Sequence, residues 1–134
     1  MTAVMPADAE YERLLAFRTE LRQFVRWSEE SAREAGLTPA LHQLLLAVRG
    51  GGSDAAGPTI GSVAEALLVK HHTAVELAQR AEASGLLERI RDDADHRVVH
   101  LRLTAEGEQR LADLSDQHLQ AIRPLAKRLT DLAS

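Results

Sequence analysis

The chain has 134 residues, of which 45% are hydrophobic and 27% charged, and its formal net charge is -4 at pH 7. This length and composition are typical of one folded domain and exclude a wholly disordered chain. Cysteine is absent, which excludes disulfides, thiolate metal sites and thiol-based redox sensing. We find no apolar run of about 18 residues and no secretory leader pattern, so a cytoplasmic protein without a membrane partner is the default expectation.

Two helices are predicted in the first third of the chain. Over residues 7–35 apolar side chains recur at steps of three and four, which predicts a long amphipathic helix. Thr38 followed by Pro39 predicts the start of a second helix, because threonine caps a helix and proline suits its first position. This helix is expected to end near Val48, before a glycine-rich flexible connection over residues 50–58.

Two more helices and a hairpin are predicted next. Thr59 is placed to cap a third helix, and a fourth is expected from roughly His72 to Ser84, where Gly85 closes it. The hydrophobic period then changes to that of strands, in two short runs at residues 86–91 and 98–103. The polar residues between these runs predict a hairpin with a charged tip.

A last helix is expected to begin after Thr104 and to kink or restart at Pro124, because proline inside a helix loses a hydrogen bond. Helices at both ends of the chain carry apolar stripes that one small domain cannot fully cover, which favours pairing with a second copy. The alternative is that the two stripes pack on each other within one chain.

Three helices followed at once by a two-stranded hairpin are the layout of a winged helix-turn-helix, a mainly α fold with a small β-hairpin wing. In such a unit the second helix of the motif enters the DNA major groove, where its outward side chains reach bases or phosphates. Taken singly, each of these side chains also suits an ordinary solvated helix face. The candidates for DNA contact on this helix are His71, His72, Thr73, Glu76, Gln79 and Arg80.

The hairpin tip carries a second group of candidates for DNA contact. Asp95 stands two residues before Arg97, so its carboxylate can hold the guanidinium by a charge-assisted bond while Arg97 reaches a narrow minor groove. Arg91 on the opposite strand and His96 complete the group. The alternative is a solvated polar turn, whose carboxylates keep the strand edge soluble and also oppose a phosphate.

Several short motifs resemble the MarR family of bacterial winged-helix transcription regulators, over nearly the whole chain. The family implies one domain over residues 1–134, with dimerisation helices at 7–35 and 105–133 and a winged helix-turn-helix unit at 38–104. It also implies a homodimer that binds a palindromic double-stranded DNA operator. The matching motifs are Gly36-Leu37-Thr38-Pro39, Thr59-Ile60-Gly61-Ser62-Val63-Ala64, Gly85-Leu86-Leu87-Glu88-Arg89, and Asp95-His96-Arg97 running into Leu103-Thr104-Ala105-Glu106-Gly107.

The resemblance further implies roles for single residues. Arg97 falls on the family's wing arginine and Asp95 on its partner. The family is usually one of repressors released by a small ligand, here a small aromatic or phenolic effector, bound between the dimer helices and the winged unit. The effector-binding candidates by this resemblance are Arg22, Arg26, Trp27 and His42; Trp27 equally suits plain core, and His42 an ordinary interior or surface position.

The chain departs from the family pattern in its turn and in its charge. Leu68 stands where a turn glycine is common, Lys70 where a serine cap is common, and Ala81 where a leucine usually packs. Residues 60–104 hold six Lys or Arg against seven Asp or Glu, whereas a family member should be more basic there. DNA affinity is therefore expected to depend on a few well-placed arginines, on helix N-termini and on histidine protonation, and a steep fall of affinity with salt would contradict this.

Other classes of function fit less well. The sequence has no phosphate-binding glycine loop, no nucleophile elbow and no evident carboxylate pair, so we do not expect an enzyme or a cofactor. Its six histidines show no metal-ligand spacing, so no metal site is expected. The main alternative is a winged-helix protein-interaction module that does not bind DNA, since the local charge is not basic.

Overall fold

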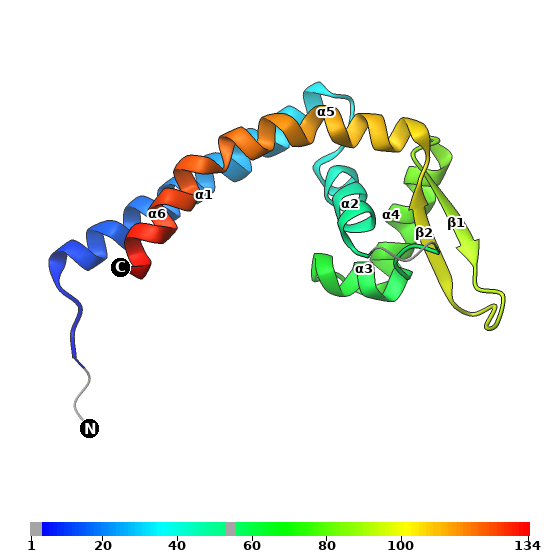
Figure 1. Ribbon diagram of the computed structural model, residues 1–134, viewed down its shortest axis with the longest axis horizontal. Coiled ribbons are helices and arrows are strands. Elements are labelled where there is room, and N and C mark those ends of the chain that lie inside the picture. The colour runs from blue at the N-terminus through cyan, green and yellow to red at the C-terminus, as the bar shows by residue number, and fades with distance from the viewer. Residues whose placement is uncertain (1–3, 53–55) are drawn as a thin grey trace.

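The computed structural model describes residues 4–52 and 56–134. Its elements follow one another in the predicted order, which confirms a mainly helical fold with one hairpin (Figure 1). Part of the predicted glycine-rich connection, residues 53–55, lies outside the described residues. Within the described ranges no helix is long and apolar enough to cross a bilayer. The bounds are α1 Asp8–Glu34, α2 Pro39–Gly50, α3 Ile60–Leu67, α4 His71–Ala83, β1 Leu87–Arg91, β2 Val99–Leu103, α5 Ala105–Ala121 and α6 Arg123–Ala133.

The molecule consists of a long curved arm and a lobe attached to one end of it (Figure 1). The arm is formed by α1 and by α5 followed by α6, which run back along α1 in the opposite direction. The lobe contains α2, α3, α4 and the hairpin of β1 and β2. The tip of the hairpin projects from the lobe away from the arm, where it is open to a partner.

The core of the lobe is built from aliphatic side chains. Leu44 and Leu45 of α2, Leu86 and Leu87 at the start of the hairpin, and Leu101 of β2 are all fully buried. On the side facing this core α4 presents Leu77 and small alanines, including Ala81 at the position where a leucine usually packs. Small side chains let α4 lie close to the core while its other side stays exposed.

The three predicted threonine caps are confirmed. The hydroxyl oxygens of Thr38, Thr59 and Thr104 accept a hydrogen bond from the backbone N–H three residues on, each at 3.1 Å. Each bond satisfies one of the free donors at a helix start. Thr104 also donates its O–H to the carbonyl of Gly85, at 2.6 Å, and so joins the start of α5 to the entrance of the hairpin.

The predicted break in the last helix is also confirmed. Between α5 and α6 only Ile122 leaves the regular helix, and Pro124 stands in the first turn of α6. Proline is tolerated there because the first N–H groups of a helix have no intrahelical acceptor. The break turns α6 along α1, and the Nε of Arg128 reaches Oε1 of Glu20 at 2.8 Å across the arm.

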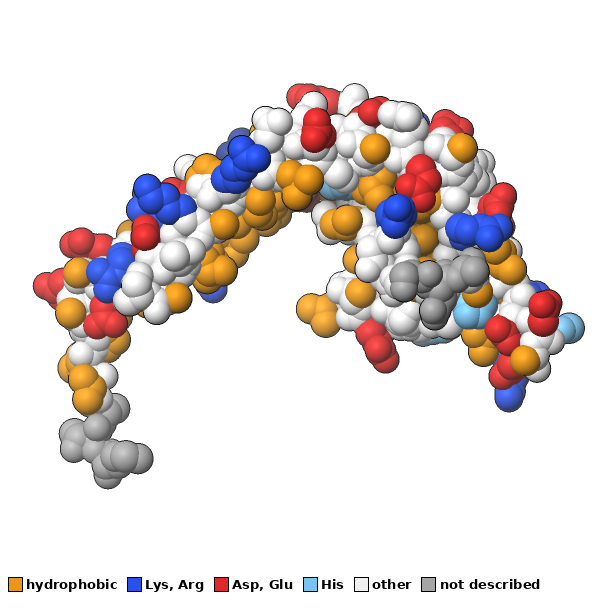
Figure 2. Space-filling model, in the orientation of Figure 1, with side chains coloured by type: hydrophobic (Ala, Val, Ile, Leu, Met, Phe, Trp, Pro, Cys, Tyr) orange, Lys and Arg blue, Asp and Glu red, His pale blue; other side chains and the backbone are white. Residues whose placement is uncertain are grey.

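The two terminal apolar stripes contact each other but do not cover each other fully. The stripes pack on each other within the chain, since α6 lies along α1. The arm nevertheless leaves large apolar side chains exposed, and Figure 2 shows such side chains along its concave side. Those that are at least 37% exposed are Tyr11, Leu14, Leu15, Val25, Leu119, Ile122 and Leu129.

The turn between α3 and α4 contains a strained residue. Leu68 adopts φ 57° and ψ 43°, the left-handed region that favours glycine. A side chain there costs about 1–2 kcal/mol, whereas glycine carries no such penalty. The Leu68 side chain is 92% exposed, so it recovers little of this cost by burial.

We therefore expect Leu68→Gly to raise the free energy of unfolding by about 1 kcal/mol, net of the greater freedom of glycine in the unfolded chain. Urea denaturation of both proteins followed by circular dichroism measures the change. A fall in the free energy of unfolding would mean instead that the leucine side chain is buried against a second molecule.

Candidate nucleic-acid interface

The exposed side of α4 carries most of the predicted DNA-contacting residues. Ala74, Leu77, Ala78 and Ala81 are buried against the lobe, which fixes the rotation of the helix about its axis. The opposite side is therefore turned to solvent, as the predicted face requires. Of the six predicted residues, Thr73 is half-buried, and the exposed ones are His71, His72, Glu76, Gln79 and Arg80.

The start of α4 lies beside the strained turn. The N-cap residue, Lys70, makes no side-chain capping bond, and its carbonyl accepts the N–H groups of Thr73 and Ala74. A serine at this position would cap the helix with its hydroxyl, whereas the lysine leaves an exposed cation at the helix start. Lys70 therefore does not cap the helix, but its positive charge can pair with a phosphate.

The hairpin tip fixes Arg97 in the predicted way. The Nε and Nη2 atoms of Arg97 donate to the two oxygens of Asp95, at 3.1 and 3.3 Å. The backbone N–H of Arg97 also donates to Asp95, at 3.0 Å, and these bonds lower the pKa of the Asp95 carboxyl. The guanidinium is nevertheless 91% exposed, so it is oriented by its partner and remains available to a ligand.

The end of the hairpin next to its tip is held by His100, a residue that the sequence analysis did not single out. Its Nδ1 lies 2.9 Å from the carbonyl of Gly57 and its Nε2 lies 3.1 Å from Oδ1 of Asp92. Both partners accept, so a ring that makes both bonds carries a proton on each nitrogen.

The other oxygen of Asp92 accepts the N–H groups of Ala94 and Asp95. These N–H bonds, chiefly the one from Asp95, and the His100 bond lower the pKa of the Asp92 carboxyl. Asp92 is thus part of the turn and not only a solubilising charge.

Arg91 and His96 lie on the two sides of the same tip. The Nη1 of Arg91 donates to the carbonyl of His96 at 3.1 Å, and both side chains are exposed. This bond crosses the hairpin and limits the movement of the tip. It leaves the imidazole of His96 directed to solvent, where the sequence predicts a contact.

The charges of the lobe divide into paired and available groups. Arg89 pairs with Glu82 at 3.0 Å and Arg102 with Glu88 at 3.4 Å, so these two arginines are largely compensated. Side chains of both signs also gather at the hairpin tip (Figure 2). Among the described residues the cations most open to an anionic ligand are Lys70, Arg80 and Arg91, together with Arg97, which stays 91% exposed although it pairs with Asp95.

The predicted effector residues are only partly brought together. His42 is buried where α2 meets the arm, with its ring centroid 4.9 Å from that of His118, and Trp27 is 4.6 Å from His118 on the same measure. Arg22 and Arg26 are exposed, and Arg26 pairs with Glu30. His118, which the sequence analysis did not name, is thus the centre of the cluster.

Hydrogen bonds define the state of the His118 ring. Nδ1 lies 2.7 Å from the carbonyl of Leu114, which only accepts, so Nδ1 carries a proton. Nε2 lies 2.7 Å from the hydroxyl of Ser28, which can donate to it when the ring is neutral. The cluster therefore joins α1, α2 and α5 through the contacts of the His118 ring. Burial, and secondly the charge of His118, lower the pKa of His42.

The lowered pKa of His42 makes stability depend on pH. Below about pH 6.5 the unfolded chain takes up a proton on His42 that the folded protein resists, so the free energy of unfolding falls as the pH drops below that value. Above about 6.5 both states are neutral and the full stability is present. Urea unfolding at about pH 8 and about pH 5 should show a smaller loss for His42→Gln than for the wild type. Equal losses in the two proteins would contradict the assignment.

Comparison with known proteins shows what this part of the chain is similar to. A sequence profile described as MarR family matches residues 35–98, from the end of α1 to the hairpin tip. The matched segment, slightly less than half of the chain, is similar to the MarR family. The matched segment contains α4, Asp95 and Arg97, so the candidate interface lies within the part of the chain that the match covers.

The same comparisons give one similar sequence and several similar structures. The HTH-type transcriptional regulator YsmB of Bacillus subtilis is 30% identical over 73 residues, which are 54% of this chain and 50% of that protein. This chain thus spans half the length of that relative.

Among solved structures, AbsC, a MarR family transcriptional regulator from Streptomyces coelicolor, is 18% identical to this chain. The match covers 95% of this chain and 84% of AbsC, with a TM-score of 0.73. A MepR–DNA complex of S. aureus is 18% identical, covers 85% of this chain and 82% of its own, and has a TM-score of 0.71. These structures confirm the winged fold.

Proposed function

We propose that this protein is a sequence-specific double-stranded DNA-binding transcription regulator, a repressor without catalytic activity. The observation that carries the proposal is the exposed guanidinium of Arg97, oriented by both oxygens of Asp95 at a projecting hairpin tip. In this arrangement α4 occupies the major groove and the tip reaches the adjacent minor groove. Such a regulator acts on chromosomal DNA in the cytoplasm of a bacterium. The MarR family match and the solved MepR–DNA complex support this reading.

The active form that we propose is a homodimer on a palindromic operator. Residues 7–35 and 105–133 form the dimerisation helices, and residues 38–104 form the winged unit that meets DNA. The exposed apolar side chains along the concave side of the arm support this assignment, because a monomer would leave them in water (Figure 2). Two copies related by a two-fold axis would present two copies of α4 to successive turns of one DNA face.

We also propose that a small aromatic or phenolic effector releases the repressor from DNA. A cavity of about 330 Å³ lies between the arm and α2, and Phe24, His42, Leu46 and His118 contribute to its lining. This volume suits a small ligand, and its walls belong to both parts of the molecule. A ligand there would change how the lobe is held on the arm. Trp27 and His42, two of the predicted effector residues, are at or beside this cavity, whereas Arg22 and Arg26 contact it only if their side chains move.

Selection of a random duplex pool at about 0.1 M salt tests the DNA-binding proposal without knowledge of the genome. An inverted repeat is expected, with half-sites about one helical turn apart. Failure to enrich any sequence, with a folded dimer confirmed by sedimentation, would favour the protein-interaction module. The two readings also differ for Arg97, because a module that does not bind DNA keeps its function when this side chain is removed.

A further inference from the structure

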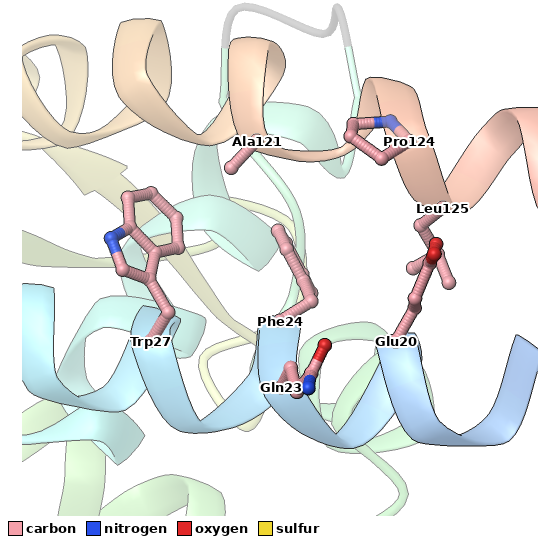
Figure 3. Close-up of a pocket in the computed structure, with 7 residues that line it drawn as sticks. All are labelled: Glu20, Gln23, Phe24, Trp27, Ala121, Pro124 and Leu125. Atoms are coloured by element: carbon pink, nitrogen blue, oxygen red, sulfur yellow. The ribbon is translucent and has the colours of Figure 1, made fainter. Parts of the chain in front are cut away.

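A second cavity lies in the arm beside the first, and Phe24 contributes to the lining of both. It has a volume of about 310 Å³ and forms where α1 passes the break between α5 and α6. Figure 3 shows Glu20, Phe24 and Trp27 pointing from α1 toward this break, with Ala121, Pro124 and Leu125 opposite. The small side chain of Ala121 and the helix break leave space that a regular helix with larger side chains would fill.

One wall of this cavity holds a carboxylate oxygen without a partner. Oε1 of Glu20 accepts from Nε of Arg128 at 2.8 Å, but Oε2 is buried and accepts no hydrogen bond. Among the described residues it is the one buried side-chain nitrogen or oxygen in this condition. Buried polar atoms are almost always paired, and an unpaired carboxylate oxygen is costly. The atom therefore indicates a missing hydrogen-bond donor.

The charge and the rings of the cavity define which donor fits. Arg128 is bonded to Glu20 and also attracted by Asp131, and both carboxylates raise the pKa of its guanidinium. These three groups together carry one net negative charge, so a cation is favoured over a neutral molecule or an anion. The rings of Phe24 and Trp27 have centroids 6.1 Å apart, and aromatic faces attract cations and pack against apolar groups.

The spacing of these groups defines the shape of the ligand. Glu20 and Trp27 are two helical turns apart on one side of α1, which corresponds to about 10 Å along the helix axis. Phe24 lies between them in Figure 3. An ammonium group at Glu20 would therefore continue into an apolar body of roughly the length of one ring and a short chain.

We propose that the cavity between α1 and the α5–α6 break binds a small organic cation, with its ammonium group on Oε2 of Glu20 and an apolar, preferably aromatic, body along Phe24 and Trp27. Binding requires only this site. The further consequence, that such a cation is an effector, rests on the proposed regulatory function. Because both sides of the cavity belong to the arm, the ligand would fix the angle of α6 against α1.

The test uses the fluorescence of Trp27, which is the only tryptophan of the chain and lines the cavity. The full-length protein is titrated without DNA with phenethylammonium, with phenethyl alcohol as the neutral probe of the same shape, and with phenylacetate as the anion. We expect a saturable change with the ammonium compound, at an affinity at least about tenfold above that of the alcohol, and none with the anion.

Two variants separate binding at the carboxylate from binding elsewhere. Glu20→Gln keeps the shape but removes the charge, and should lower the affinity for phenethylammonium about tenfold or more while that for the alcohol stays unchanged. Glu12→Gln, at an exposed position of the same helix, is the matched control and should bind as the wild type does. Ala121→Leu fills the cavity from the opposite side and should abolish binding without touching the carboxylate. Circular dichroism confirms that each variant is folded.

Three results would overturn the proposal: equal affinities for the cation and the alcohol, unchanged binding by Glu20→Gln, or no saturable change at all. The last is also the result expected if a side chain of a second copy occupies the cavity in the dimer. The assay contains no DNA, so the two proposals are tested separately. A protein that binds the cation but selects no duplex would refute the proposed regulator and leave this binding site intact. A protein that selects a duplex but does not bind the cation would refute this site and leave the regulator intact.

Discussion

Replacing Arg97 by alanine is expected to weaken the binding of the selected operator by about 100-fold, without changing the fold or the oligomeric state. Asp95 already orients the guanidinium in the free protein, so little side-chain freedom is lost when the arginine meets the minor groove. The change also leaves the Asp95 carboxylate unpaired and close to the phosphates, which adds repulsion. In a dimer both effects occur twice. Fluorescence anisotropy of a labelled operator at fixed salt measures the loss.

Arg102→Ala is the matched control for this experiment. It removes an arginine from the same hairpin, but Arg102 pairs with Glu88 along the strands and not at the tip. Its loss should reduce operator affinity by less than about tenfold, the effect of one general positive charge. Similar losses for Arg97→Ala and Arg102→Ala would mean that the hairpin contributes only overall charge, and would contradict the specific role of the tip.

Replacing Gly107 by alanine is expected to lower the free energy of unfolding by about 3 kcal/mol and the Tm by about 10 °C. A Cβ at this position would lie 2.0 Å from the carbonyl oxygen of Leu86, and the obstacle is backbone, which cannot rotate away. The same carbonyl accepts the N–H of Thr104, so moving it would disturb the joint between the hairpin and α5. Thermal unfolding followed by circular dichroism measures the change.

Gly61→Ala provides the control, because Gly61 is also a helical glycine but has open space around it. Its nearest neighbour would be the Thr59 hydroxyl at 3.9 Å, an ordinary contact. Alanine is a better helix former than glycine, so stability should be unchanged or raised by less than about 1 kcal/mol. If Gly107→Ala proved as harmless as Gly61→Ala, the close approach of α5 to the hairpin would be wrong.

The helices and strands were predicted well, because the residues that start and end each element lie next to it in the sequence. Thr38, Thr59 and Thr104 mark helix starts and each makes the expected capping bond, and Gly85 adopts the expected positive φ at the end of α4. Pro124 likewise marked the break in the last helix. The strained turn at Leu68 shows the limit of such signals, since leucine gives no local sign of a left-handed conformation.

The site was predicted where its partners are close in sequence and missed where they are distant. The contact of Asp95 with Arg97 spans two residues and followed from spacing alone. His100 depends on Gly57, more than forty positions away, and Ser28 meets His118 across ninety positions. Nothing in the sequence indicated either histidine's role, because tertiary packing, not spacing, brings their partners to them.

The most direct test of the central claim is a competition titration, in which a labelled copy of the selected duplex is displaced by unlabelled duplex of the same or of scrambled sequence. The account predicts two chains per duplex and a preference of at least about 1,000-fold for the selected sequence. Equal competition by the scrambled duplex, or one chain bound per duplex without preference, would contradict a dimeric sequence-specific regulator.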